Sequence, residues 1–186
     1  ENTDLRLIKF LAKTKKPLII SLGLATLKQI EEAVNTARKF GCKKLMLLKC
    51  TSDYPARAAD ANLNSIEFLK KKFKCEVGLS DHTEGLGVSV AAIAKGATII
   101  EKHFTFDKKV KSVDSKFSLD PLEMKNLVKE TNAAWEAEGK IEFFKSQSEK
   151  KNLIFRRSVY VVKNIKKGEK FTTKNLRCIR PGFGVN

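Results

Sequence analysis

The segment EVGLSDHTEGLGVSVAAIAKGATIIEKH, residues 76–103, decides the fold because it contains a strand, a loop, a helix and a second strand in that order. Residues 76–79 form a short, mostly apolar run, and residues 80–87 are polar and glycine-rich. Residues 88–94 read as a helix of small apolar residues, and residues 97–100 form the next β-rich run. This order predicts two parallel strands joined by a crossover helix.

The same alternation extends to both sides of this segment. Before it, short apolar runs predict strands at 18–21 and 45–48, and after it a long helix is expected at 121–138. Thr26 can cap a helix between the first two strands, and Gly41 can end it. Further helices are expected at 5–12 and 63–73.

Four successive βα units predict an α/β fold with a parallel sheet. Continuous apolar runs suit strands that are buried on both faces, as in a parallel sheet or barrel. A complete (β/α)₈ TIM barrel takes about 250 residues, whereas the chain has 186. We therefore expect half a barrel, occupying residues 1–139.

A second module is expected after Gly139, where the sequence becomes polar and lysine-rich. We interpret residues 140–155 as a linker. Alternation at 157–162 predicts a strand, and residues 156–186 begin a module that ends too soon to bury a core. Because the chain also opens on Glu1 rather than methionine, we expect it to be cut at both ends.

Composition excludes several classes of protein. The most apolar stretch, residues 88–100, is interrupted by Lys95 and is shorter than the roughly 20 residues of a membrane span. The opening residues do not resemble a secretory signal. The four cysteines contain no Cys-x-x-Cys pair, which favours a reducing cytoplasm.

The net charge of +16 raises the question of nucleic-acid binding. The lysines are spread over most expected helices and loops, without interleaved aromatic residues or a known binding motif. We interpret them as solvated surface, with a positive field that helps recruit small anionic substrates. No nucleic-acid partner is expected.

Polar side chains follow all four expected strands. They are Ser21, residues 49–54, residues 80–83 and residues 101–103. In parallel α/β proteins the reactive groups gather at the carboxyl ends of the strands, because the loops open there. The serines among them can bind a phosphate or carboxylate, or can simply cap turns.

Both histidines of the chain, His82 and His103, lie at these ends, on consecutive strands. Two neutral imidazoles on neighbouring strands can share a divalent cation and leave positions open for water or substrate. Asp81 and Glu101 are close enough in sequence to orient the rings. The alternative is that both histidines are ordinary polar loop residues.

Several blocks of the chain, in order and spacing, resemble the sialic acid synthase family. They are Pro17-Leu18-Ile19-Ile20-Ser21 with Gly23, Cys50-Thr51-Ser52-Asp53-Tyr54-Pro55, Gly78-Leu79-Ser80-Asp81-His82-Thr83, Ile100-Glu101-Lys102-His103-Phe104-Thr105, and the tail Arg156-Arg157-Ser158 through Arg180-Pro181-Gly182. The resemblance implies strands five to eight of a TIM barrel, followed by a truncated antifreeze-like (SAF, β-clip) domain. It also implies a domain-swapped homodimer.

The resemblance further implies a metal-dependent condensation of phosphoenolpyruvate with an amino-sugar (hexosamine-type) aldehyde. His82 and His103 would bind Mn²⁺, with Mg²⁺ or Co²⁺ as alternatives, and Glu101 would join them in catalysis. The residues implied to hold phosphoenolpyruvate are Ser21, Ser52 and Ser80, and those implied to contact the sugar are Tyr54, Glu101, Asp114 and Arg180. Ser52 stands where some members have asparagine, which keeps a hydrogen-bonding group.

Two departures resemble the pseudaminic acid branch of the family. Lys49 stands where the neuraminic and legionaminic branches commonly carry histidine, and residues 113–120 differ from their Pro-Asp-His block. Phe117 would make the sugar site less polar, which suits a deoxy carbon. N-acetylneuraminate or legionaminate synthesis remains the alternative within the family.

A function of another class is a non-catalytic binding module on the same scaffold. It predicts salt-sensitive binding that is indifferent to chelators, whereas the enzyme hypothesis predicts loss of turnover with EDTA and rescue by manganese. Because a half barrel leaves strand edges unpaired, we expect the isolated chain to be inactive or poorly folded.

Overall fold

The computed structural model describes residues 2–110, 112–143 and 146–185, which fall into two compact units. Unit 1 comprises residues 1–139 and unit 2 comprises residues 140–186. No helix in the described ranges is long and apolar enough to cross a membrane.

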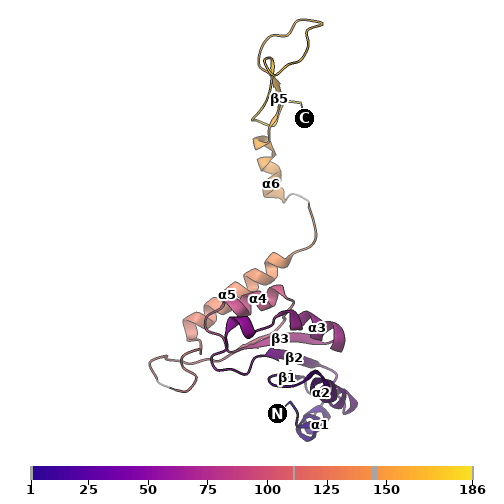
Figure 1. Ribbon diagram of the computed structural model, residues 1–186, viewed down its shortest axis with the longest axis vertical. Helices are drawn as coiled ribbons and strands as arrows, with labels where there is room; N and C mark the ends of the chain where they lie inside the picture. The colour runs from indigo at the N-terminus through magenta and orange to yellow at the C-terminus, as the bar shows by residue number, and fades with distance from the viewer. Residues whose placement is uncertain (1, 111, 144–145, 186) are drawn as a thin grey trace. The chain divides into compact units, whose positions relative to one another are not determined.

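Unit 1 is built from βα repeats in the order predicted from the sequence (Figure 1). Its strands are β1 (Leu18–Ser21), β2 (Leu45–Cys50), β3 (Glu76–Asp81) and β4 (Ile100–Lys102). Its helices are α1 (Leu5–Lys13), α2 (Leu27–Lys39), η1 (Ala58–Asp60), α3 (Asn64–Phe73), α4 (Gly87–Ala94) and α5 (Pro121–Glu138).

Local capping explains where two of these helices begin. Thr26 accepts a hydrogen bond from the backbone N–H of Gln29, whose side chain accepts one from the backbone N–H of Thr26. Asp120 and Glu123 form the same reciprocal pair at the start of α5. Each capping box satisfies two backbone donors that a helix leaves without partners.

The four strands form one parallel sheet in the order β1-β2-β3-β4. The register aligns Ser21 with Leu48, Cys50 with Ser80, and Ser80 with Glu101. Because side chains alternate between the faces of a strand, these aligned residues share one face, which we call the inner face. The residues between them share the opposite, helix-facing side.

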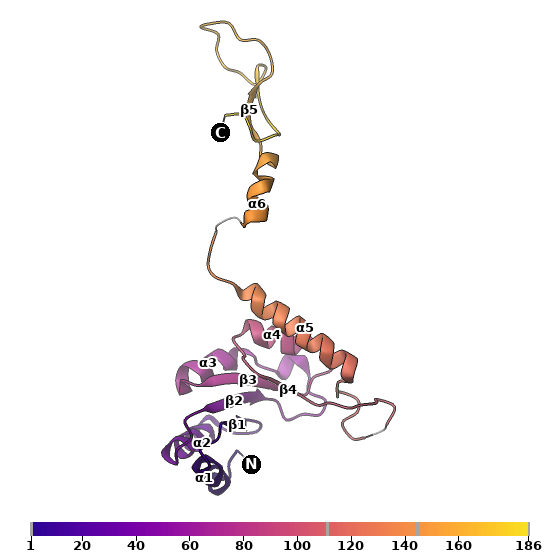
Figure 2. The ribbon, with the colours of Figure 1, turned by 180° about the vertical axis from the view of Figure 1, so that it is seen from behind.

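The main core lies on the helix-facing side. Strand residues such as Leu47 and Val77, both 0% exposed, pack there with residues of α1, α2, α3 and α4. Figures 1 and 2 show α1 and α2 together near β1, and α4 beside α5. The helices therefore cover one side of the sheet, and the inner face presents the strand ends.

The fourth strand differs from the prediction. We expected it at 97–100, but β4 comprises Ile100–Lys102. Backbone hydrogen bonds already join residues 98 and 99 to β3, from Thr98 N–H to the Val77 carbonyl and from Leu79 N–H to the Ile99 carbonyl. The paired residues of the two strands begin only at Ile100, opposite Leu79. Pairing with β3, rather than the β-rich run alone, therefore sets the boundary.

Unit 2 contains α6 (Gln147–Lys151), η2 (Asn152–Phe155), β5 (Ser158–Val161) and β6 (Leu176–Ile179). The two strands form an antiparallel pair, with Val159 opposite Cys178. Residues 147–155, which we predicted as linker, are helical, because Ser146 and Glu149 form another capping box. The alternation at 157–162 correctly indicated a strand.

Candidate active site

The inner face gathers reactive side chains at the ends of β3 and β4. Ser80 and Glu101 are aligned neighbours, and the Ser80 hydroxyl donates a hydrogen bond of 2.7 Å to Glu101 Oε1. His82 and His103 each follow two residues later, so alternation places their rings on the same face. Their ring centroids lie 5.1 Å apart.

The His82 ring is held in one tautomer by a backbone oxygen. Its Nδ1 lies 2.9 Å from the carbonyl oxygen of Thr51, and a carbonyl can only accept a hydrogen bond. Nδ1 therefore carries a proton, and Nε2 is the ring nitrogen left to face a metal. His82 is buried, at 6% exposure.

The His103 ring also has an oxygen neighbour at Nδ1, in this case a carboxylate. Its Nδ1 lies 3.4 Å from Asp114 Oδ2. The long loop after β4 folds back to make this contact, because Leu119 donates a backbone hydrogen bond to the carbonyl of His103. Asp114, which the resemblance implied as a sugar contact, thus also orients the second histidine.

The spacing of the two rings suits a shared cation. A metal–nitrogen bond is near 2.1 Å, and the centroid of an imidazole ring lies about 1.1 Å behind the bonded nitrogen. For an N–metal–N angle of about 90–109°, the centroids of two imidazoles on one ion are therefore roughly 4.5–5.2 Å apart. The observed 5.1 Å falls in this range. Among the described residues there is no group of three or more metal-competent side chains, so the histidine pair fits a metal as two ligands only.

Two aromatic side chains enclose the histidines. The centroid of the Tyr54 ring lies 4.2 Å from that of the His82 ring. The centroid of the buried Phe117 ring lies 4.9 Å from that of the His103 ring. Burial first, and then electrostatic contributions from neighbours that include Asp114 and Glu101, raise the pKa of the Tyr54 phenol above its ordinary value. Tyr54 is therefore a hydrogen-bond donor at neutral pH.

The predicted serines lie at the ends of three neighbouring strands. Ser21 and Ser80 share the inner face. The Ser52 hydroxyl lies 3.8 Å from the Cys50 thiol, which in turn lies 3.9 Å from His82 Nδ1. A Cβ on Gly23 would lie 2.1 Å from the Ser52 hydroxyl, so only glycine at this position leaves the hydroxyl where it is.

The structure corrects the expectation that Asp81 and Glu101 orient the histidine rings. Asp81 points to the helix-facing side, where it accepts hydrogen bonds from Thr83, Ser89 and Lys102. Glu101 binds Ser80 instead. The alternation of side chains along a strand could have predicted that Asp81 and His82 lie on opposite faces. The contact between His82 and the backbone oxygen of Thr51 could not be predicted, because every residue has such an oxygen.

Lys49 also lies on the helix-facing side, in the same alternating row as Leu45 and Leu47. It lines a cavity of about 290 Å³ between α2 and α3. Burial lowers the pKa of its ammonium. Lys49 is therefore not beside the histidines, unlike Phe117.

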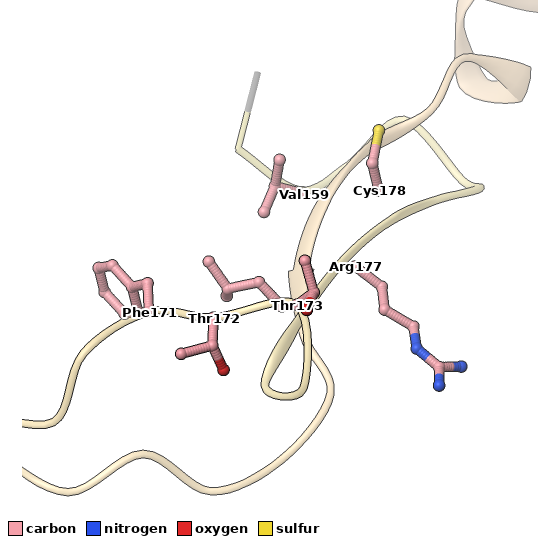
Figure 3. Close-up of a pocket in the computed structure, with 7 residues that line it drawn as sticks. Val159, Phe171, Thr172, Thr173, Arg177 and Cys178 are labelled. Atoms are coloured by element: carbon pink, nitrogen blue, oxygen red, sulfur yellow. The ribbon is translucent and has the colours of Figure 1, made fainter.

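Unit 2 has a pocket of its own, of about 420 Å³ (Figure 3). Two of the residues that line it, Phe171 and Arg177, lie on opposite sides of the group drawn in Figure 3. None of the predicted site residues lines this pocket. Arg180, the one predicted site residue in unit 2, directly follows β6 and is exposed.

Together, the parallel sheet, its single helical layer and the polar strand ends define unit 1 as a βα-repeat protein of the barrel class. Its parallel sheet is curled into a half barrel, like that of a solved N-acetylneuraminic acid (sialic acid) synthetase from Leptospira borgpetersenii. That structure matches 82% of this chain and 53% of its own, with a TM-score of 0.74 and 34% identity.

The NeuB family model matches residues 1–143, and the chain belongs to the NeuB family. It is 43% identical over 186 residues to the pseudaminic acid synthase of Campylobacter jejuni, covering all of this chain and 54% of that protein. It is 44% identical over 189 residues to the N,N'-diacetyllegionaminic acid synthase of the same species, covering 57% of it. The chain thus spans about half the length of these relatives.

Proposed function

We propose that the complete protein condenses phosphoenolpyruvate with the aldehyde of an amino sugar, giving a nonulosonic acid of the pseudaminic type and phosphate. The observation that carries this proposal is the pair His82 and His103, with ring centroids 5.1 Å apart on the inner face. Similarity to two synthases of such acids, at 43% and 44% identity, supports the same reaction class.

His82 and His103 would hold a divalent cation, Mn²⁺ in our proposal, with Mg²⁺ or Co²⁺ as alternatives. When bound, such a cation supplies a Lewis acid for the sugar aldehyde. The contact with the Thr51 carbonyl fixes a proton on His82 Nδ1, so Nε2 would be the nitrogen that binds the cation. Asp114 plays the corresponding part beside His103.

The three serines would hold the anionic substrate. Ser21, Ser52 and Ser80 carry hydroxyl groups at or just after the ends of β1, β2 and β3, and hydroxyl donors bind carboxylate and phosphate oxygens. The Ser80 hydroxyl would exchange its bond to Glu101 for one to the substrate. In the reaction, carbon 3 of phosphoenolpyruvate bonds to the aldehyde carbon, and the aldehyde oxygen takes up a proton. Water adds at carbon 2, the bond between carbon 2 and the bridging oxygen breaks, and phosphate leaves with that oxygen. The added water loses its protons as carbon 2 becomes a carbonyl, and Glu101, which accepts a hydrogen bond from Ser80, would receive one of them.

For the acceptor sugar we propose the pseudaminic branch, a 6-deoxy-2,4-diacetamido hexose. Phe117 supports it, because this buried ring packs on His103 and provides an apolar wall. Tyr54, half exposed above His82, supplies a polar contact. Lys49 carries less weight, because it faces the helices. The two Campylobacter relatives are nearly equal in identity, so legionaminate synthesis is the alternative to be tested.

We further propose the organisation that the family resemblance implies. Residues 1–139 would be the carboxyl-terminal half of a synthase barrel, residues 140–155 a linker, and residues 156–186 the start of an antifreeze-like domain. Arg180 would reach the active site of a second subunit in a domain-swapped homodimer. The complete protein would act in the cytoplasm, and the isolated chain would be inactive.

The test is turnover by the complete protein with phosphoenolpyruvate and each candidate hexosamine, followed by phosphate release and product mass. We expect turnover with the 6-deoxy sugar of altro configuration, its loss with EDTA, and its return with Mn²⁺. Turnover with another hexosamine would reassign the branch. Absence of turnover with every sugar, or indifference to the chelator, would overturn the proposal in favour of a binding module.

A further inference from the structure

A buried ion pair lies on the helix-facing side of the two strands that carry the histidines. Asp81 ends β3, Lys102 ends β4, and the two are aligned in the sheet. Lys102 Nζ lies 2.9 Å from Asp81 Oδ2, and the two side chains are 0% and 1% exposed. Neither side chain reaches the inner face, so neither is used by the reaction proposed above.

This pair lies in a network of short hydrogen bonds. Asp81 Oδ1 accepts hydrogen bonds from the backbone N–H and the hydroxyl of Thr83, at 2.8 and 2.7 Å. Asp81 Oδ2 also accepts from the Ser89 hydroxyl of α4, at 2.6 Å. With the contact from Lys102 Nζ, donors from three residues therefore hold the Asp81 carboxylate in place.

Its position relative to the histidines is specific. Asp81 immediately precedes His82, and Lys102 immediately precedes His103. Besides Asp81, Lys102 Nζ donates to the backbone carbonyl of Thr83, at 2.6 Å. The ammonium of Lys102 thus contacts both residues that flank His82 in the chain, Asp81 and Thr83. The next residue after Lys102 is His103.

Stability alone gives a weak reason for such a pair. Two buried charges lose their hydration, and apolar residues of similar volume often stabilise a fold as well or better. Hydrogen bonds differ from apolar packing because their distances and angles are restricted. A bonded network therefore fixes the relative position of two strand ends more tightly than an apolar contact.

We propose that Asp81 and Lys102 are positioning residues that set the separation of His82 and His103, so that both rings can bind one cation. The inference rests on the proposed function, in which these two histidines are the metal ligands. Ser89 and Thr83 support the pair by holding the Asp81 carboxylate. Neither Asp81 nor Lys102 touches substrate.

The test measures Mn²⁺ affinity of the complete protein by titration, independently of turnover. We expect Lys102→Met to weaken Mn²⁺ binding by about 10- to 100-fold, the range for residues that support metal ligands. The matched control is Lys70→Met, which removes a lysine 3.3 Å from Glu76 at the opposite end of β3. The control should bind Mn²⁺ like the parent protein.

Two further variants keep the test decisive if Lys102→Met does not fold. The double variant Asp81→Leu/Lys102→Met removes both charges, and Ser89→Ala removes only one hydrogen bond to Asp81. We expect the double variant to fold and still bind Mn²⁺ at least tenfold more weakly, and Ser89→Ala to show a smaller loss. In a crystal structure of the metal-free double variant, the separation of the histidine rings should depart from 5.1 Å.

The outcomes separate this inference from the proposed function. Parental Mn²⁺ affinity in the folded double variant and in Ser89→Ala would overturn the positioning role and leave the metal site standing. If the parent protein itself fails to bind Mn²⁺ through His82 and His103, the metal site and the positioning role are both wrong.

Discussion

The two faces of the same strand ends differ in how their polar groups are bonded. On the inner face, His82 and His103 use Nδ1 for an oxygen partner and present their other nitrogen to the site. On the helix-facing side, Asp81 and Lys102 are buried and hydrogen-bonded to each other and to neighbours. The first arrangement leaves one ring nitrogen of each histidine for chemistry, whereas the second turns its charged groups toward each other.

Adjacent residues of one sequence block can therefore have separate roles, one in the site and one in the structure that supports it. Asp81 and His82 are adjacent in the chain, but alternation sends their side chains to opposite faces. A block such as Ser80-Asp81-His82 therefore contains both reactive groups and the network that holds them. The comparison predicts that substitutions of the inner-face histidines reduce turnover, and that breaking the buried Asp81–Lys102 pair reduces stability.

The largest expected effect is on turnover. Replacing either inner-face histidine, by His82→Ala or His103→Ala, should reduce kcat of the complete protein by about 10³-fold or more, because a metal needs both ligands. The melting temperature of His103→Ala should change little, since His103 is partly exposed. Phosphate release measures the first quantity and calorimetry the second. Retention of a tenth of the parental kcat would remove these residues from catalysis.

The next effect is on stability. Lys102→Met should lower the free energy of unfolding by about 3–5 kcal/mol, because it leaves the Asp81 carboxylate buried without its partner. Lys71→Met, which removes an exposed pair with Glu67, should leave it almost unchanged, because water screens exposed charges. Urea unfolding of the complete protein measures both. Equal losses would show that burial of the Asp81–Lys102 pair has no consequence.

A substitution beside Ser52 should act on substrate binding. In Gly23→Ala the new Cβ must displace the Ser52 hydroxyl, so we expect the KM for phosphoenolpyruvate to rise about tenfold, equivalent to about 1.4 kcal/mol. Gly87→Ala is the control, because nothing lies within 4 Å of its Cβ position. An unchanged KM in Gly23→Ala would argue that Ser52 does not hold this substrate.

The smallest effect concerns Lys49 and its pH dependence. Burial lowers its pKa in the folded protein, so the charged form disfavours folding at neutral pH, and this disadvantage disappears as pH rises to the ordinary lysine value of 10.5. Lys49→Met should therefore be slightly more stable than the parent at pH 7, and this advantage should shrink above pH 10. A variant that is less stable at pH 7 would show that the hydrogen bonds of Lys49 to Cys50 and Thr51 dominate.

Much of unit 1 could be predicted from the sequence because its elements are periodic. The apolar spacing and caps indicated α2 and α5, and glycine-bounded apolar runs indicated β1, β2 and β3. The boundary of β4 was wrong, because the run at 97–100 looks like a strand whatever its neighbours do. Its true start depends on pairing with Leu79 of β3, which is a tertiary constraint.

The candidate site was predictable in part. The strand ends placed His82 and His103 together, since parallel strands open at one edge. The roles of Asp81 and Thr51 were not, because an aspartate beside a histidine looks like its partner, and a backbone carbonyl has no sequence identity. Only the structure distinguishes the Thr51 oxygen from the Asp81 carboxylate as the partner of the His82 ring.

The most direct test of a shared metal site is anomalous diffraction at the manganese edge from crystals of the complete protein soaked in Mn²⁺. The account predicts one strong peak at bonding distance from Nε2 of both His82 and His103, on the same face as Glu101. A peak elsewhere, or on one histidine alone, would contradict it.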